Sequence, residues 1–238
     1  MAGKGEFIKE TGAVAEGHFV YKAGYAHGDL YINKEQFSKM GAKKLISLID
    51  RVGANALTLG LGFNGVKKVG IIGPAYGAIP FSLSLAAFFE SAIQIPFFPA
   101  RTQLVRDNTG RDHHVIPEKL LKDYQDGAFI IHDDIVNNGT TIKEVARLFR
   151  NAVNGRILAA TCFVDRGGQT AESLGVEQYY PYFAKKLEQY DLREAPCPLC
   201  RAGVPITTDL GKGREWVAIF GQPPYPYPED MDFSGFWE

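Results

Sequence analysis

Cysteine is scarce in this sequence, and the shortage excludes one class of protein at once. Three cysteines among 238 residues are too few for a disulfide-stapled secreted scaffold, which favours a reducing compartment. An excess of charge of one sign is also missing, because 26 basic residues face 27 acidic ones. This balance argues against electrostatic binding to nucleic acid. Since the first residues show no apolar signal-peptide segment, we expect a cytoplasmic protein without a nucleic-acid partner.

Long hydrophobic runs are missing as well. The most apolar stretch, residues 69–98, is broken by three prolines and by Glu90 and Gln94. No run approaches the roughly 18 uninterrupted apolar residues of a membrane-spanning helix, so we expect no membrane partner. A hydrophobic content of 45% and an aromatic content of 12% nevertheless provide a sizeable core and exclude disorder for most of the chain.

Short apolar runs alternate with helical patterns along the middle of the chain. The expected strands cover residues 68–72, 128–132 and 157–164. The expected helices cover residues 36–59, 78–89 and 141–149. This alternation predicts an α/β fold with a central parallel sheet flanked by helices. In such sheets ligands bind beyond the carboxyl ends of the strands, where turns meet helix N-termini.

The remaining segments are less regular. Residues 12–33 contain short strands and turns, and the polar residues 101–126 are typical of a mobile surface loop or lid. From Tyr179 onward the pattern dissolves into aromatic and proline-rich sequence, and we expect an extended tail at the end. We expect one domain over residues 1–238, in which residues 206–238 form a C-terminal extension.

Two adjacent carboxylates, Asp133 and Asp134, follow the apolar run that ends at His132. Carboxylates accept hydrogen bonds from neighbouring hydroxyls, so the pair suits a polyol. The turn that follows offers main-chain N–H groups at a helix N-terminus, which bind an anion through fixed dipoles. A plainer interpretation is that Asp133 starts a turn and that a threonine caps the helix. The order of strand, acids, Gly139-Thr140-Thr141 and helix favours a site for a ribose 5-phosphate.

This segment resembles the phosphoribosyl pyrophosphate motif of type I phosphoribosyltransferases, and other segments resemble the orotate branch of that family. Residues 17–24 with 30–33 are similar to its N-terminal segment, which forms part of a hood over the base. Residues 73–80 are similar to its pyrophosphate loop, residues 164–166 to a strand end where arginine meets the pyrimidine, and residues 197–205 to a C-terminal segment of some members. The resemblance implies the type I phosphoribosyltransferase fold, with small N-terminal hood elements within residues 1–60.

The resemblance also implies an activity and its residues. The activity is Mg²⁺-dependent transfer of ribose 5-phosphate from phosphoribosyl pyrophosphate to a pyrimidine, orotate first, in pyrimidine biosynthesis by a homodimer. Asp133 and Asp134 would hold the ribose hydroxyls, and Arg166 would hold an acidic pyrimidine. The other implied residues bind the 5-phosphate (Asn138, Gly139, Thr140, Thr141), the pyrophosphate (Tyr76, Gly77, Arg101, Arg106), the base or pyrophosphate (Lys22), and further parts of the substrates (Tyr31, Asn137).

Some positions depart from the family pattern, and two alternatives stay open. Thr102 and Asn108 stand where the family's loop has a lysine and a histidine, for which His113 and His114 would have to substitute. Asn137 stands where a threonine is usual, and asparagine both donates and accepts hydrogen bonds. The first alternative is therefore transfer to a purine or to uracil. The second is a non-catalytic regulator that binds phosphoribosyl pyrophosphate.

Cys197-Pro-Leu-Cys200 has the spacing of half a zinc site. A complete site requires two further ligands, and the sequence contains no second pair at such spacing. Histidines or a second copy of the chain would have to complete it. Two reduced thiols in a tight turn are the alternative interpretation.

Overall fold

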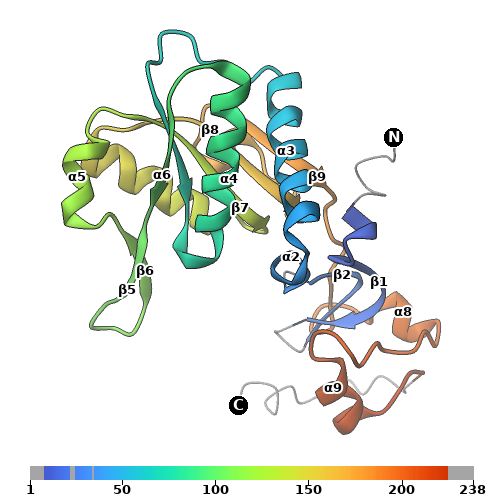
Figure 1. The fold of residues 1–238 in the computed structure, drawn as a ribbon. Coiled ribbons are helices and arrows are strands. Elements are labelled where there is room, and N and C mark those ends of the chain that lie inside the picture. The colour runs from blue at the N-terminus through green and yellow to red at the C-terminus, as the bar shows by residue number, and fades with distance from the viewer. Residues whose placement is uncertain (1–7, 22–24, 34, 225–238) are drawn as a thin grey trace. The chain divides into compact units, whose positions relative to one another are not determined.

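The computed structural model describes residues 8–21, 25–33 and 35–224. The chain divides into two compact units (Figure 1). The terminal unit is formed by Met1–Met40 together with Leu187–Glu238, and the sheet unit is formed by Gly41–Lys186. Whether the two units together form one functional domain, as the sequence predicts, stays a prediction.

The sheet unit contains a five-stranded sheet in which every neighbouring pair of strands is parallel. In spatial order its strands are β4 (Phe97–Arg101), β3 (Val69–Gly73), β7 (Ala128–Val136), β8 (Arg156–Asp165) and β9 (Tyr179–Ala184). Parallel strands need crossover connections, and helices supply them here. The predicted α/β fold with a central parallel sheet is confirmed.

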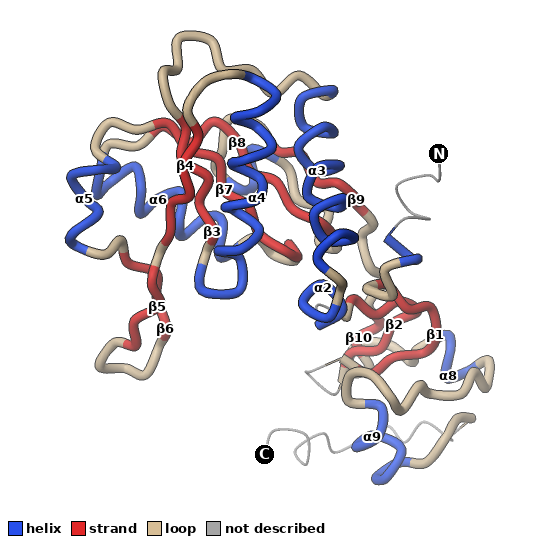
Figure 2. Tube along the Cα trace, in the orientation of Figure 1, coloured by secondary structure: helices blue, strands red, loops and turns tan. Residues whose placement is uncertain are grey.

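Helices cover both faces of this sheet (Figures 1 and 2). On one face lie α3 (Ala42–Thr58) and α4 (Ala75–Ile93), and on the other lie α5 (Glu118–Tyr124) and α6 (Thr140–Val153). A short helix, α7 (Ala171–Leu174), follows β8. The buried side chains of α6 are spaced three or four residues apart, so they form one apolar stripe against the sheet.

Strand β7 shows how the local sequence determines which side chains face which helices. Phe129 and Ile131 belong to the core that α6 closes, whereas His132 contacts Phe81 and Phe163 on the α4 face. This alternation is the two-residue period of a strand with both faces buried. Each fully buried aliphatic or aromatic side chain contributes about 1.5–3 kcal/mol relative to an exposed one.

The terminal unit contains an antiparallel sheet of three strands in the order β1 (Val14–Val20), β2 (Ala26–Ile32) and β10 (Tyr190–Asp191). Its helices are α2 (Glu35–Lys39), α8 (Pro198–Arg201) and α9 (Gly213–Phe220). The short strands predicted within residues 12–33 are confirmed. The predicted helix over residues 36–59 is instead two helices, α2 and α3, separated at Met40 and Gly41.

Two predictions about irregular segments are wrong. The expected loop at residues 101–126 contains the antiparallel hairpin of β5 (Gln103–Arg106) and β6 (Asp112–Val115), followed by α5. The segment after Tyr179 contains β9, β10, α8 and α9, which are too short for a periodic pattern to be recognised in the sequence. Residues 225–238, where we predicted an extended tail, lie outside the described residues. Among the helices that are described, none has the length and apolar character needed to cross a membrane.

Acid should destabilise the sheet unit through His132. Burial lowers the pKa of this histidine from 6.5 to about 3, and Nδ1 lies 2.9 Å from Thr161 Oγ1. Between these two pKa values the unfolded chain binds a proton that the folded chain does not bind, so the free energy of unfolding falls as the pH falls. We expect a loss of roughly 1 kcal/mol per pH unit in this window, measured by urea denaturation.

The variant His132→Gln isolates this effect, because the other buried histidines remain in both proteins. Burial also lowers the pKa values of His27 and His114, so the wild-type slope contains their contributions too. The variant should therefore lose less stability than the wild type on acidification. Equal slopes in the two proteins would show that His132 becomes protonated in the folded state.

Candidate active site

The carboxyl edge of the parallel sheet brings several predicted residues together. Arg101 ends β4 and pairs in register with Gly73, the last residue of β3. Val136 ends β7 and pairs with Asp165, the last residue of β8. The turns that follow β3, β7 and β8 therefore leave the sheet at one edge, which is where ligands of such sheets bind.

Asp133 and Asp134 lie within β7, which extends four residues past the predicted strand end at His132. The prediction that both acids lie in a turn is therefore wrong. Both side chains are half-buried. Asp133 Oδ1 accepts the N–H of Asp134 at 3.0 Å, and Asp134 Oδ1 accepts the N–H of Ile135 at 2.7 Å. Asp133 pairs in register with Cys162 of the core on the α6 face, so the strand period directs Asp134 to the α4 face.

The turn between β7 and α6 is built around Asn138 and Gly139. Asn138 Oδ1 accepts both the N–H and the hydroxyl of Thr140, at 3.2 and 2.8 Å, and Lys143 Nζ donates to the Asn138 carbonyl at 2.9 Å. Gly139 has φ of 71°, the left-handed region that glycine adopts at little cost. Helix α6 begins directly after it, one residue earlier than predicted, so its first N–H groups lie in this turn.

Substituting Gly139 by alanine should destabilise the chain through this turn. A Cβ atom there would clash with Cδ2 of the fully buried Leu174, so this side chain would have to shift within the core. This contact and the left-handed φ both disfavour alanine. We expect a loss of about 1–3 kcal/mol in the free energy of unfolding, measured by urea denaturation. Gly110→Ala is the matched control, because Gly110 has φ of 79° and nothing within 4 Å of the added Cβ. Equal losses in both variants would exclude the packing contribution.

The turn after β8 depends on Asp165, which the sequence analysis did not single out. This buried carboxylate accepts the N–H groups of Gly167, Gly168 and Gln169 at 2.9, 3.0 and 2.9 Å. The Asp-x-Gly-Gly pattern was the available signal, since such a carboxylate orders a tight turn through local main-chain N–H groups. Asp165 therefore fixes the conformation of the main chain directly after Arg166.

Arg166 and Asn137 lie beside each other at the ends of neighbouring strands. The N–H of Arg166 donates to the Val136 carbonyl at 2.9 Å, and a Cβ atom at Gly167 would lie 1.7 Å from the Asn137 carbonyl oxygen. Arg166 is half-buried, and within the part of the chain that the structure describes its Nε has no hydrogen-bond partner. A buried guanidinium nitrogen of this kind is suited to a planar anion.

The β5–β6 hairpin extends from the sheet unit beyond β4 (Figure 2). Arg106 lies on it and pairs with Asp112 at 3.0 Å, and both side chains are more than half exposed. The structure thus does not bring Arg106 to the end of β4, where Arg101 lies. His114 is buried, with Nδ1 2.8 Å from Thr102 Oγ1 and its N–H donating to Glu144 Oε1 at 2.6 Å. In this structure His114 anchors the hairpin and does not face outward as a substitute for a loop histidine.

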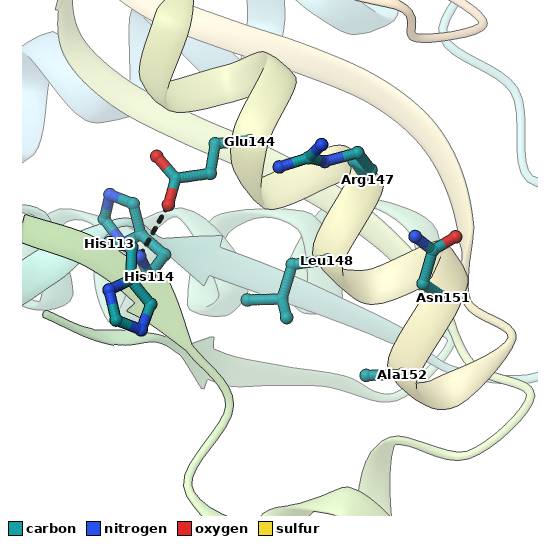
Figure 3. A pocket seen from close by; sticks show the side chains of 7 residues that line it. All are labelled: His113, His114, Glu144, Arg147, Leu148, Asn151 and Ala152. Carbon is teal, nitrogen blue, oxygen red and sulfur yellow. Dashed lines mark hydrogen bonds between the residues drawn. The ribbon is translucent and has the colours of Figure 1, made fainter. Parts of the chain in front are cut away.

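A hollow of about 360 Å³ lies beside this anchor, between β6 and α6 (Figure 3). Seven side chains line it: His113, His114, Glu144, Arg147, Leu148, Asn151 and Ala152. Apart from His113 and His114, the possible substitutes for the family's loop residues, its lining includes none of the residues that the resemblance implies for substrate binding. The hollow forms where the hairpin packs against α6, and we do not assign the candidate active site to it.

For the remaining predicted residues the structure gives fewer contacts. Tyr76 and Gly77 fall in the first turn of α4 and not in a loop before it, and their side chains and those of their neighbours lie outside the described residues. Lys22 lies outside the described residues as well. Tyr31 belongs to β2 of the terminal unit, where its half-buried ring lies 5.5 Å from the ring of Phe19. Thr141 is half-buried near the start of α6.

Comparisons with known proteins point in one direction. A family model described as the phosphoribosyl transferase domain matches residues 49–196. An orotate phosphoribosyltransferase of Thermus thermophilus is 28% identical over 201 residues, which cover 84% of this chain and 96% of that protein. One of Carboxydothermus hydrogenoformans is 28% identical over 205 residues, which cover 83% and 91%. The crystal structure of orotate phosphoribosyltransferase from Francisella tularensis is similar in fold, with a TM-score of 0.53, 17% identity, and 75% of this chain and 84% of that chain covered.

Proposed function

The chain belongs to the phosphoribosyl transferase domain family, and from that premise we propose that it transfers ribose 5-phosphate from phosphoribosyl pyrophosphate to orotate. The products are orotidine 5-phosphate and pyrophosphate. The resemblance found in the sequence is confirmed at the level of the family and the fold. The observation that carries the proposal is the meeting of Asp133, Asp134, the Asn138–Thr141 turn and Arg166 at one sheet edge.

The turn before α6 is the proposed site of the 5-phosphate. It combines the positive end of a 14-residue helix with two threonine hydroxyls and a glycine that lets a ligand approach the backbone. The N–H and hydroxyl of Thr140 now bond to Asn138 Oδ1, and a phosphate oxygen would replace that acceptor. The turn therefore needs little rearrangement for Thr140 to donate to a bound phosphate oxygen instead of to Asn138 Oδ1.

The two carboxylates of β7 are proposed to accept hydrogen bonds from the ribose hydroxyls. Their oxygen atoms also fit the preference of Mg²⁺ for oxygen ligands, and we propose that they help to hold it through the substrate's oxygens and waters. The chemistry that bound Mg²⁺ would supply is positive charge beside the pyrophosphate leaving group. The bond between ribose C1 and pyrophosphate oxygen breaks, a bond from C1 to the base nitrogen forms, and the proton of that nitrogen passes to water or to the released pyrophosphate. Because C1 gains positive character as that bond breaks, nearby carboxylates stabilise the transition state.

Arg166 is proposed to bind the carboxylate of the pyrimidine, since a guanidinium binds a planar carboxylate through two parallel hydrogen bonds. Arg101 at the end of β4 is proposed to contact the pyrophosphate, with Tyr76 and Gly77 at the start of α4. Lys22 and Tyr31 keep their proposed substrate contacts from the family resemblance, and Arg106 is proposed to exchange its pairing with Asp112 on the hairpin for one with the pyrophosphate. A homodimer is proposed on the same basis.

A pyrophosphate-release assay tests the function. Purified protein is supplied with Mg²⁺, phosphoribosyl pyrophosphate and, in separate reactions, orotate, uracil, adenine and hypoxanthine. We expect release with orotate and at least about 100-fold less with uracil, because only orotate offers a carboxylate to Arg166. Turnover with a purine and not with orotate would replace the proposed substrate. Tight binding of phosphoribosyl pyrophosphate without release for any base would favour a regulator.

A further inference from the structure

Four buried side chains of the terminal unit converge on one point. His18 comes from β1, His27 from β2, and Cys197 and Cys200 from the start of α8 and from α8 itself. Each has a relative exposure of 0%, and their nitrogen and sulfur atoms all lie within 4.8 Å of one another. His18 and Cys197 are 179 residues apart in the chain, so the fold itself assembles this group. We call it the His-Cys cluster.

The spacing of the cluster matches the edges of a metal-centred tetrahedron. His18 Nε2 lies 3.0 Å from His27 Nδ1, 3.7 Å from Cys197 Sγ and 3.5 Å from Cys200 Sγ. Cys200 Sγ lies 3.3 Å from His27 Nδ1. Tetrahedral Zn²⁺ with ordinary bond lengths places two nitrogens about 3.3 Å apart and a nitrogen and a sulfur about 3.6 Å apart. The observed distances are close to both values.

The hydrogen bonding around His18 leaves its inner nitrogen free to bind a metal. Nδ1 lies 2.8 Å from the Val204 carbonyl, which only accepts, so Nδ1 carries the proton and Nε2 presents a lone pair to the cluster. A second ring nitrogen that donates to a carbonyl is the usual support of a metal-bound histidine. The ring of His27 is held edge-on against Trp216, with centroids 4.5 Å apart.

The donor types of the cluster also suit a metal. Thiolate sulfur and neutral imidazole nitrogen are the forms in which cysteine and histidine bind zinc.

We propose that His18, His27, Cys197 and Cys200 form a structural Zn²⁺ site. Two sulfur and two nitrogen donors in a tetrahedral arrangement select zinc over the hard ions Mg²⁺ and Ca²⁺. The site is closed, because four protein ligands complete the coordination and all four are buried, so it has no open position for substrate. The histidines supply the two ligands that the Cys197-Pro-Leu-Cys200 pair lacked in the sequence.

The His-Cys cluster lies beside a small group of buried apolar residues. Among the described residues this group consists of Trp216, Val20 and Ile206, with a few half-buried neighbours. Small units are commonly stabilised further by a metal. Zinc would join the β1–β2 hairpin to the segment that contains α8, which the chain connects only through the whole sheet unit.

Metal analysis of the purified chain tests the proposal. We expect about one zinc per chain by mass spectrometry after dialysis against metal-free buffer, since closed structural sites retain zinc. Cys197→Ser and His27→Asn should each lose most of this zinc. Cys162→Ala is the matched control, because Cys162 is also buried but lies in β8, and it should keep the metal. A wild-type chain with no zinc, with iron in its place, or with zinc that the Cys197 variant retains overturns the proposal.

Cobalt substitution gives a second measurement that needs no variant. Wild-type chain denatured with a chelator and refolded with Co²⁺ alone should show intense visible d–d bands of a tetrahedral ion and a thiolate charge-transfer band. Addition of Zn²⁺ should abolish both. Refolded protein that binds no Co²⁺, or in which Cys197 and Cys200 form a disulfide with each other under native conditions, contradicts the site. Neither measurement depends on the transferase reaction, so the proposed function stands or falls separately.

Discussion

The double variant Asp133→Asn/Asp134→Asn should lose phosphoribosyl transfer while keeping its fold. Asparagine has nearly the same shape as aspartate, and its side-chain oxygen can still accept the N–H groups of Asp134 and Ile135 that the carboxylates now accept. The negative charge that we propose to lie near ribose C1 is removed, however. We expect turnover to fall at least about 1,000-fold, measured as pyrophosphate release with saturating substrates.

The control for this prediction changes the same charge at the opposite edge of the sheet. Asp123 and Asp126 precede β7, both are exposed, and the left-handed φ of 53° at Asp126 is one that asparagine tolerates. Asp123→Asn/Asp126→Asn should leave turnover within about twofold, because exposed substitutions away from a site have small effects. The single variants Asp133→Asn and Asp134→Asn then show how much of the loss of turnover comes from each carboxylate. Undiminished turnover in the first double variant would exclude the proposed role.

Arg166→Gln should weaken the use of orotate far more than it weakens binding of phosphoribosyl pyrophosphate. Glutamine keeps a polar side chain but loses the charge and the paired donors that bind a carboxylate. We expect kcat/KM for orotate to fall about 100-fold or more, since removing one partner of a buried charged hydrogen bond costs several kcal/mol. The dissociation constant for phosphoribosyl pyrophosphate should change little.

A matched arginine on the same strand serves as the control for Arg166. Arg156 begins β8 at the opposite edge, and it is paired with Glu177 at 2.7 Å with both side chains largely exposed. Such surface pairs contribute about 0–1 kcal/mol, so Arg156→Gln should leave kcat/KM for orotate unchanged. Parallel losses in both variants would point to a general effect of charge, and an unchanged Arg166→Gln enzyme would remove the proposed base contact.

The strand, turn and helix around residues 128–153 were predictable because their signals are local. Apolar residues with both faces buried, a glycine at a left-handed turn and a helical stripe each leave a short-range pattern. The sequence predicted that this strand ends at His132, because aspartate is an unfavourable residue type in strands. In the structure β7 continues past Asp133 and Asp134, since pairing with β8 outweighs that preference.

Other features depend on contacts between distant residues, which a single sequence does not display. The hairpin of β5 and β6 is anchored by the contacts of His114 with Thr102 and Glu144, so composition alone suggested only a loop. His18 and His27 lie in segments without metal-ligand spacing, and only the folded terminal unit places them beside Cys197 and Cys200. Asp165 was passed over because its partners are main-chain groups, which no residue type reveals.

A crystal structure with phosphoribosyl pyrophosphate and Mg²⁺ bound tests the account most directly. The ester phosphate should accept hydrogen bonds from the turn at residues 138–141, and the ribose hydroxyls should lie against the carboxylates of Asp133 and Asp134 within β7. The pyrophosphate should extend toward the start of α4 and the end of β4. Ligand density at any other surface, or a turn whose amides stay closed on Asn138 at saturating ligand, would contradict the account.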